Sequence, residues 1–242
     1  MFLDALSAAA RAPRLVVTSD FDGTLSPIVN NPADARALPG AAAALVALSQ
    51  CPDTTAALIS GRALTVLREL SGMPDSVHLV GSHGAEFDSG FAHPIDTALL
   101  GTITDALHAI AADKPGVAVE SKPASVALHV RNASAADASA ALAEARFAAH
   151  DWAAQLTEGK AVLEFAVITT DKGEAIDILR ERYDASTVVY FGDDVTDEKA
   201  FRRLHDGDIG VKVGPGETLA RFRIDAPTDV AEALEYLLDR RR

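Results

Sequence analysis

The sequence predicts an α/β protein, with a parallel-sheet core and a smaller inserted α+β domain, on two observations. Near both ends of the chain, short apolar runs rich in β-branched residues alternate with helical patterns. Such alternation is typical of βα units that form a parallel sheet with helices on both faces. In the middle, two adjacent strand patterns joined by "KPA" indicate an antiparallel hairpin instead. We therefore predict a core domain of residues 1–98 and 168–242 and an inserted cap domain of residues 99–167.

The first half of the core begins with "MFLDALSAAARAPR", which has no basic leader and whose apolar run is interrupted by Asp4. It predicts a short first helix rather than a signal peptide. The strands that follow are predicted at "RLVVTSDF", "TTAALISGR" and "VHLVGSHG". The helices between them are predicted at "PGAAAALVALSQ" and "ALTVLRELSG".

The inserted segment is predicted to contain the helix "TITDALHAIAA", the strands "GVAVES" and "SVALHVR", a long helix from Ser134 to Leu156, and the strand "KAVLEF". The α/β pattern then returns with the helices "KGEAIDILRERY" and "DEKAFRRL" and the strands "TVVYFGDD" and "DIGVKVG". The last helix, "DVAEALEYLLDRRR", has Asp229 near its start and arginines at its end, the arrangement that the helix dipole favours.

Composition narrows the function classes. The chain has 242 residues, of which 48% are hydrophobic, and its net charge is −13. This acidic balance argues against nucleic acid or an anionic membrane surface as a partner, since both require basic patches. The sequence contains no run of about 18 apolar residues, so no membrane span is predicted. The single Cys51 allows no internal disulfide, so we expect a soluble cytoplasmic protein, and a monomer.

Two carboxylates follow the first core strand. Asp20 and Asp22 are two residues apart, and alternate residues of a strand point the same way, so both can face the edge where the strands end. Gly23 permits a tight turn, and Thr24 adds a hydroxyl group. The alternative is that Asp22 and Gly23 form an ordinary turn, with Asp20 as a helix cap or a surface charge.

Further polar residues lie at other predicted strand ends. Ser60 ends the run "ALISGR", where its hydroxyl could hold a phosphate oxygen or simply belong to a turn. Lys172 begins a helix, where the dipole disfavours a cation, although a surface lysine remains possible. Asp193, Asp194 and Asp197 could cap a helix, but they also suit a hard cation with oxygen ligands, Mg²⁺ first.

Four motifs together resemble the haloacid dehalogenase superfamily of phosphatases and occur in that family's order. They are the aspartate pair with Gly23 and Thr24, the strand-end Ser60, Lys172, and the acidic group from Asp193 to Asp197. The resemblance implies a Rossmann-like core in which Asp20 is the nucleophile and forms an aspartyl-phosphate. Mg²⁺ would be bound by the Asp20 carboxylate, the backbone carbonyl of Asp22 and Asp193. Asp22 would also act as general acid and then as general base.

The resemblance assigns roles to the remaining core residues as well. Lys172 would supply a second positive charge, and Ser60 would complete the phosphate cradle with the N–H groups around Gly23 and Thr24. Asp194 and Asp197, with the hydroxyl of Thr24, would orient the metal ligands and Lys172 from behind.

Longer motifs look like the trehalose-6-phosphate phosphatase family over most of the chain: "DFDGTLSPIVNNPADA", "LISGR", "GSHGAEF", "GDDVTDEKAF" and "VGPGETLARFRI". This likeness implies a sugar phosphate substrate, with Gly23, Arg62 and His83 among the residues that bind it.

In the inserted domain, "ESKPASVALHVR" matches the family's E-x-K…H-x-R pattern, and "VLEF" supplies its glutamate. The resemblance implies that the sugar without phosphate is bound by Glu120, Lys122, Arg131 and Glu164. From spacing alone, the alternative is a cross-strand ion pair on a solvated sheet face.

The match has departures, and other functions remain open. Phe165, Ala166 and Val167 stand where the family usually has a β-branched residue, a basic residue and proline, and Phe222 replaces a tyrosine. A phosphatase for sucrose phosphate or another glycosyl phosphate would keep the same core. A phospho-accepting receiver module also combines acidic residues, Mg²⁺, Ser/Thr and Lys, but it is near half this length and lacks both the inserted domain and the second aspartate.

Overall fold

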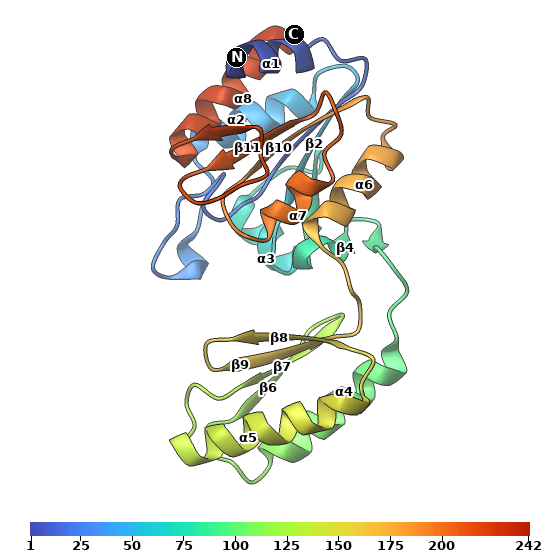
Figure 1. The fold of residues 1–242 in the computed structure, drawn as a ribbon, viewed down its shortest axis with the longest axis vertical. Helices are drawn as coiled ribbons and strands as arrows, with labels where there is room; N and C mark the ends of the chain where they lie inside the picture. The colour runs from blue at the N-terminus through green and yellow to red at the C-terminus, as the bar shows by residue number, and fades with distance from the viewer. The chain divides into compact units, whose positions relative to one another are not determined.

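The computed structural model describes residues 1–242 and divides the chain into two compact units (Figure 1). The core unit comprises Met1–Ala92 and Thr170–Arg242, and the insert unit comprises His93–Thr169. The core unit contains a mostly parallel sheet and the insert unit a small antiparallel one, which confirms the predicted fold class. No helix in either unit combines the length and the apolar character needed to cross a membrane.

The core unit is built on an eight-stranded sheet in the order β12-β11-β10-β1-β2-β3-β4-β5. The six strands from β12 to β3 are parallel, and β4 and β5 add an antiparallel edge. Their bounds are β1 Leu15–Ser19, β2 Thr54–Ile59, β3 Val77–Gly81, β4 Glu86–Phe87, β5 Gly90–Phe91, β10 Thr187–Gly192, β11 Ile209–Val213 and β12 Phe222–Ile224. Every residue of β1 is buried, because β1 lies in the middle of the sheet with helices over both faces.

Helices cover the two faces of this sheet. Their bounds are α1 Phe2–Ala9, α2 Pro39–Ser49, α3 Leu64–Ser71, α6 Lys172–Arg182, α7 Asp197–Arg202 and α8 Pro227–Arg241. Leu15 and Val17 of β1 pack in the same hydrophobic cluster as α1, α2, α3 and α8. Val16, between them, packs in the cluster that contains α6 and α7. Because successive side chains of the strand point to opposite faces, β1 contributes to a separate hydrophobic cluster on each face of the sheet.

The two ends of the chain meet in the core unit, where α1 packs against α8 (Figure 1). The guanidinium group of Arg241, near the end of α8, donates to the carbonyls of Ala10 and Ala12 at 3.0 and 2.5 Å. It also donates to the carbonyls of Pro52 and Asp53, just before β2 begins. The termini therefore lie at the amino ends of the strands.

The insert unit has a four-stranded antiparallel sheet in the order β6-β7-β9-β8 and two helices. The bounds are α4 Thr97–Ala111, β6 Ala118–Ser121, β7 Ser125–His129, α5 Ala135–Ala148, β8 Gln155–Gly159 and β9 Val162–Ala166. Apolar residues of both helices pack with Val126, Leu128 and Phe165 in a single cluster. Both helices therefore cover one face of the sheet, which leaves the polar side chains of its strands to the other face.

The predicted helix from Ser134 to Leu156 is wrong in its last part. The α5 helix ends at Ala148, a short 3₁₀ turn spans Ala149–Asp151, and β8 follows. The Trp152 ring packs edge-on against Phe165, with the ring centroids 5.1 Å apart. This contact and the pairing of β8 with β9 stabilise a strand where local propensity favours a helix.

Candidate active site

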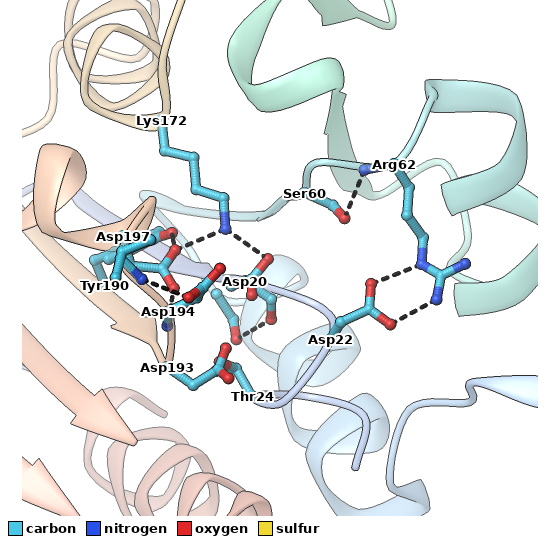
Figure 2. A network of polar contacts seen from close by, with 12 residues as sticks. Asp20, Asp22, Thr24, Ser60, Arg62, Lys172, Tyr190, Asp193, Asp194 and Asp197 are labelled. Atoms are coloured by element: carbon cyan, nitrogen blue, oxygen red, sulfur yellow. Dashed lines mark hydrogen bonds and ion pairs between the residues drawn. The ribbon is translucent and has the colours of Figure 1, made fainter. Parts of the chain in front are cut away.

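The core residues predicted to be functional gather at the carboxyl edge of the parallel sheet (Figure 2). Asp20 follows β1, Ser60 follows β2 and Asp193 follows β10. Lys172 is the first residue of α6. Because the carboxyl ends of parallel strands share one edge, segments far apart in the sequence deliver their side chains to the same place.

The centre of the site is a buried group of Asp20, Lys172 and Asp197. The Lys172 Nζ lies 2.9 Å from Asp20 Oδ1 and 2.7 Å from Asp197 Oδ1. These three residues are 4%, 2% and 0% exposed. The helix N-terminus tolerates the cation because both carboxylates pair with it, while Asp171 caps the first backbone N–H groups of α6.

Burial governs the protonation of this group. It raises the pKa of Asp20 to about 8, although the charge of Lys172 opposes the shift; the Asp197 carboxylate adds to it. Burial acts to lower the pKa of Lys172, but Asp20 and Asp197 outweigh it and raise that pKa above its ordinary value. Even with Lys172 in contact, the site therefore disfavours negative charge on Asp20, and additional positive charge is needed to favour it.

Asp193 lies beside this group and is held by the turn after β1. The Thr24 hydroxyl donates to Asp193 Oδ1 at 3.2 Å. A Cβ atom at position 23 would lie 2.1 Å from Asp193 Oδ2, so only glycine leaves room for this carboxylate. The N–H of Gly23 donates to the Ser26 carbonyl, so Gly23 contributes space rather than a donor. Burial, and then the charge of Asp197, raises the pKa of Asp193.

This donor set fits a hard divalent cation. Asp20, Asp193 and Asp197 each offer a carboxylate oxygen, and these oxygens lie within 4.8 Å of one another. Oxygen ligands of this kind suit Mg²⁺. Asp197 Oδ1 accepts from Lys172 and from the Tyr190 hydroxyl at 2.5 Å, and its Oδ2 accepts from the Asp194 N–H at 2.8 Å. Since Asp197 is engaged within the protein, Asp20 and Asp193 are the better candidates for direct ligands.

A second group lies next to the first and contains Asp22. Both Asp22 oxygens accept hydrogen bonds from the Arg62 guanidinium, at 2.6 Å each. This pairing raises the pKa of Arg62. The backbone N–H of Arg62 donates to the Ser60 hydroxyl oxygen at 3.2 Å, and the N–H of His83 donates to the Ser60 carbonyl at 2.9 Å. His83 has a positive φ of 55°, uncommon for a residue other than glycine.

Asp194, predicted to orient the metal ligands and Lys172, contributes through its backbone. The side chain of Asp194 is exposed, and its Oδ1 accepts from the Val195 N–H at 2.7 Å. Its contacts with Asp197 come from the backbone: its N–H donates to Asp197 Oδ2 at 2.8 Å, and its carbonyl accepts from the Asp197 N–H at 3.2 Å. Of the two residues predicted to orient Lys172 from behind, Asp197 therefore contacts the lysine and Asp194 helps to hold Asp197.

Two residues of the site are not among those predicted from the sequence. Tyr190, on β10, is fully buried and donates to Asp197. Lys212, on β11, is 4% exposed, and its Nζ donates to the backbone carbonyl of Asp193. Both stand in runs of apolar strand residues, "TVVYFG" and "IGVKV", and a lysine inside such a run is the signal that could have revealed one of them.

In the insert unit, the predicted sugar-binding residues gather on the sheet. Glu164 Oε1 accepts from Lys122 at 2.9 Å and from the Ser125 hydroxyl at 2.7 Å. Glu120 pairs with His129 at 2.8 Å. The predicted residue Arg131 lies just beyond β7 and is exposed.

The departures from the family pattern lie in different surroundings. Phe165 is fully buried in the helix-facing core of the insert unit, whereas Glu164 belongs to the opposite face of β9. Ala166 shares the face of Glu164 and pairs with Ser125. Phe222 packs against Phe2 of α1, with the ring centroids 5.3 Å apart.

The sequence of this chain is similar to known proteins over most of its length. Residues 18–229 match the family model described as trehalose-phosphatase. A trehalose-phosphate phosphatase of Mycobacterium avium is 36% identical over 257 residues, which cover 96% of this chain and 63% of that protein. The chain thus spans less than two thirds of the length of this relative.

Two solved structures share the fold. The Aspergillus fumigatus trehalose-6-phosphate phosphatase superposes with a TM-score of 0.73 at 24% identity, covering 99% of this chain and 97% of that chain. A haloacid dehalogenase-like hydrolase from Bacteroides thetaiotaomicron gives a TM-score of 0.68 at 13% identity, covering 92% of this chain and 98% of that chain. From its sequence motifs, its buried carboxylate cluster and these matches, the chain belongs to the trehalose-phosphatase family.

Proposed function

We propose that this protein is a Mg²⁺-dependent phosphatase that hydrolyses trehalose-6-phosphate to trehalose and inorganic phosphate through an aspartyl-phosphate. The observation that carries this proposal is the buried contact of Lys172 with Asp20 and Asp197, next to Asp193, at the carboxyl edge of the sheet. Membership of the family and the names of the mycobacterial relatives support the substrate.

Asp20 is the nucleophile. One of its carboxylate oxygens attacks phosphorus, and the bond from phosphorus to the sugar oxygen breaks. Lys172, 2.9 Å from Asp20 Oδ1, favours the charged carboxylate and orients it, and Asp197 keeps the lysine in place. The Ser60 hydroxyl donates to an oxygen of the transferring phosphoryl group.

The metal site is formed by the carboxylates of Asp20 and Asp193 and by the backbone carbonyl of Asp22. When bound there, Mg²⁺ supplies positive charge against the acidic groups and the phosphoryl oxygens. Thr24 and Gly23 orient Asp193 for this purpose, one with a hydrogen bond and the other with space.

Asp22 transfers the proton. It protonates the leaving sugar oxygen, then accepts a proton from the water that attacks the aspartyl-phosphate, and the broken phosphorus–oxygen bond regenerates Asp20. In the structure both Asp22 oxygens accept from Arg62. Arg62 therefore has to leave Asp22 before the proton is donated, and the phosphate of the substrate is the natural new partner for the guanidinium, with His83 beside it.

The insert unit supplies specificity. Glu120, Lys122, Arg131 and Glu164 bind the sugar that carries no phosphate, because charged side chains make strong hydrogen bonds to hydroxyl groups. A substrate that lacks the matched hydroxyls leaves these side chains unpaired and is rejected. We further propose that the protein acts as a monomer in the cytoplasm, where the single Cys51 stays reduced.

The test is a phosphate-release assay on trehalose-6-phosphate, sucrose-6-phosphate and glucose-6-phosphate, with and without Mg²⁺. Trehalose-6-phosphate is expected to be hydrolysed with the highest kcat/KM, and only with the metal. Preference for another ester would refute the disaccharide while leaving the phosphatase intact. Absence of hydrolysis on every ester would refute the phosphatase itself. Light scattering after size-exclusion chromatography tests the monomer.

A further inference from the structure

Lys212 is a buried lysine at the catalytic edge of the core unit. It is the fourth residue of β11 and only 4% exposed. Its neighbours Val211 and Val213 pack in the cluster that contains α1, α2, α3 and α8, so the Lys212 side chain leaves the strand on the opposite face. A buried ammonium group is costly unless it is hydrogen-bonded, which makes its partner informative.

That partner is the backbone of Asp193. Lys212 Nζ donates to the Asp193 carbonyl oxygen. The register explains the contact, because Lys212 lies opposite Gly192, the last residue of β10, and Asp193 follows at once. The acceptor is a peptide carbonyl rather than a carboxylate, so the contact constrains the backbone at the point where the chain leaves the sheet.

The peptide group between Asp193 and Asp194 is thereby held at both ends. Its carbonyl accepts from Lys212, and its N–H donates to Asp197 Oδ2 at 2.8 Å. The Asp193 side chain is limited separately, by the hydrogen bond from Thr24 and by its close approach to Gly23. Fixing the peptide plane fixes the backbone from which the Asp193 carboxylate extends.

We propose that Lys212 is a positioning residue of the metal site, which holds the backbone of Asp193 so that its carboxylate meets a divalent cation together with Asp20. This inference rests on the proposed function, in which Asp193 is a metal ligand. Residues that orient metal ligands in this way typically change metal affinity by about 10–100-fold when they are replaced.

Charge and positioning predict opposite effects, which makes the proposal testable. An ammonium group near the acidic cluster repels a cation, so loss of its charge alone would tighten Mg²⁺ binding. Loss of the hydrogen bond to the Asp193 carbonyl would weaken binding, because the carboxylate would no longer be held in place. The sign of the change in affinity therefore separates the two roles.

The experiment is isothermal titration of Mg²⁺ into the substrate-free protein, with the Mg²⁺-dependent rise in Tm as a second readout. Lys212→Met keeps the length of the side chain but removes the donor and the charge. We expect its Mg²⁺ affinity to fall by about tenfold or more. Lys160→Met, the same change at an exposed turn of the insert unit, should bind Mg²⁺ as the wild type does. Unchanged or tighter binding by Lys212→Met would overturn the proposal.

A second variant covers the case in which Lys212→Met does not fold, as judged by circular dichroism. Lys212→Arg retains a donor, so its Mg²⁺ affinity should stay close to that of the wild type, and a loss of tenfold or more would refute positioning. Failure of the proposed function looks different: Mg²⁺ binds and Lys212→Met weakens it, but no phosphate ester is hydrolysed. A wild type that binds no Mg²⁺ would refute this inference together with the metal dependence.

Discussion

Asp20 combines two properties that rarely occur together in one carboxylate. It is 4% exposed, and it lies within 2.9 Å of a lysine that also pairs with Asp197. Burial disfavours its charged form, and the neighbouring cation offsets this only in part. A nucleophile needs the charged form with few water molecules around it; burial provides the second condition, and the first requires positive charge in addition to Lys172.

Replacing Asp20 tests its role most directly. Asp20→Asn preserves the shape but removes the charged oxygen that attacks phosphorus, so turnover of trehalose-6-phosphate should vanish. Initial rates of phosphate release measure this. The matched control is Asp75→Asn at a fully exposed position, which should leave the rate unchanged. Survival of more than a few per cent of activity in a clean Asp20→Asn preparation would exclude the covalent mechanism.

The raised pKa of Asp20 predicts a pH-dependent stability of the metal-free protein. In the folded protein this pKa is about 8, against 3.8 as the ordinary value. The folded state therefore binds a proton more tightly than the unfolded state, so this group's contribution to stability is complete below about pH 4 and is lost as the pH rises through 8.

In EDTA, the Tm of the wild type should fall more between pH 5 and pH 8 than the Tm of Asp20→Asn, which lacks this titration. Added Mg²⁺ should reduce the difference, because the cation stabilises the charged carboxylate. Parallel melting curves for the two proteins across this pH range would contradict the assignment.

At this scale, the sequence predicts residues whose chemistry is unusual for their place. The acidic pair at Asp20 and Asp22 and the lysine at a helix N-terminus are visible without coordinates. Tyr190 is not, since tyrosine is a common strand residue and its contact with Asp197 depends on the path of the following loop. The pairing of Asp22 with Arg62, 40 residues apart, also arises only when the strand ends meet.

Among the elements, the sheet of the insert unit holds the residues proposed to bind the second sugar. Glu164 and Lys122 are each about one third exposed and pair with one another. If they bind sugar, Glu164→Ala should lower kcat/KM for trehalose-6-phosphate by about 10–100-fold, at roughly 1.4 kcal/mol per decade. Hydrolysis of p-nitrophenyl phosphate should barely change, because that ester has no second sugar.

The competing interpretation, a solvated ion pair, gives a different pattern. Exposed pairs contribute only about 0–1 kcal/mol, so both substrates would show small and equal losses. Lys122→Ala should follow Glu164→Ala, provided that circular dichroism shows an intact fold. Equal losses on the two esters would remove these residues from the sugar site and leave the phosphatase in place.

The core of the insert unit depends on Phe165. It is fully buried and contacts the only tryptophan of the chain, Trp152. Phe165→Ala should destabilise this unit by about 3–5 kcal/mol, through lost apolar contact and the cavity left behind. Urea unfolding followed by tryptophan fluorescence reports on this unit directly. Phe147→Ala, at a side chain 80% exposed, is the matched control and should change little.

The elements show where sequence patterns stop being informative. Buried strands such as β1 and β10 are predicted well, because nearly every residue is apolar or small and turns bound the run. All five residues of β8 are exposed, so no alternation marks the strand, and its pairing with β9 creates it. The strands β4, β5 and β12, of two or three residues, are defined by neighbours that sequence does not reveal.

For the whole molecule, activity should depend on one kind of cation. EDTA should abolish phosphate release, and Mg²⁺ should restore it. Ca²⁺ should inhibit, because its larger and more flexible shell admits additional oxygens, including both oxygens of Asp20, and so spoils in-line attack. Steady-state rates with each ion after chelation measure this. Full activity in EDTA, with elemental analysis showing no metal, would remove Asp193 from its proposed role.

The two termini lie near one another, at the edge of the core sheet opposite the catalytic residues, and this arrangement is useful for engineering. Arg241 contacts the carbonyls of Ala10 and of Asp53, at the amino ends of the strands, whereas Asp20 and Asp193 lie at the carboxyl ends. A tether to a solid support at either terminus would therefore attach the protein at the edge of the core sheet opposite the phosphate site. A short linker between the ends would also allow circular permutation, with new termini opened in an exposed loop of the core unit.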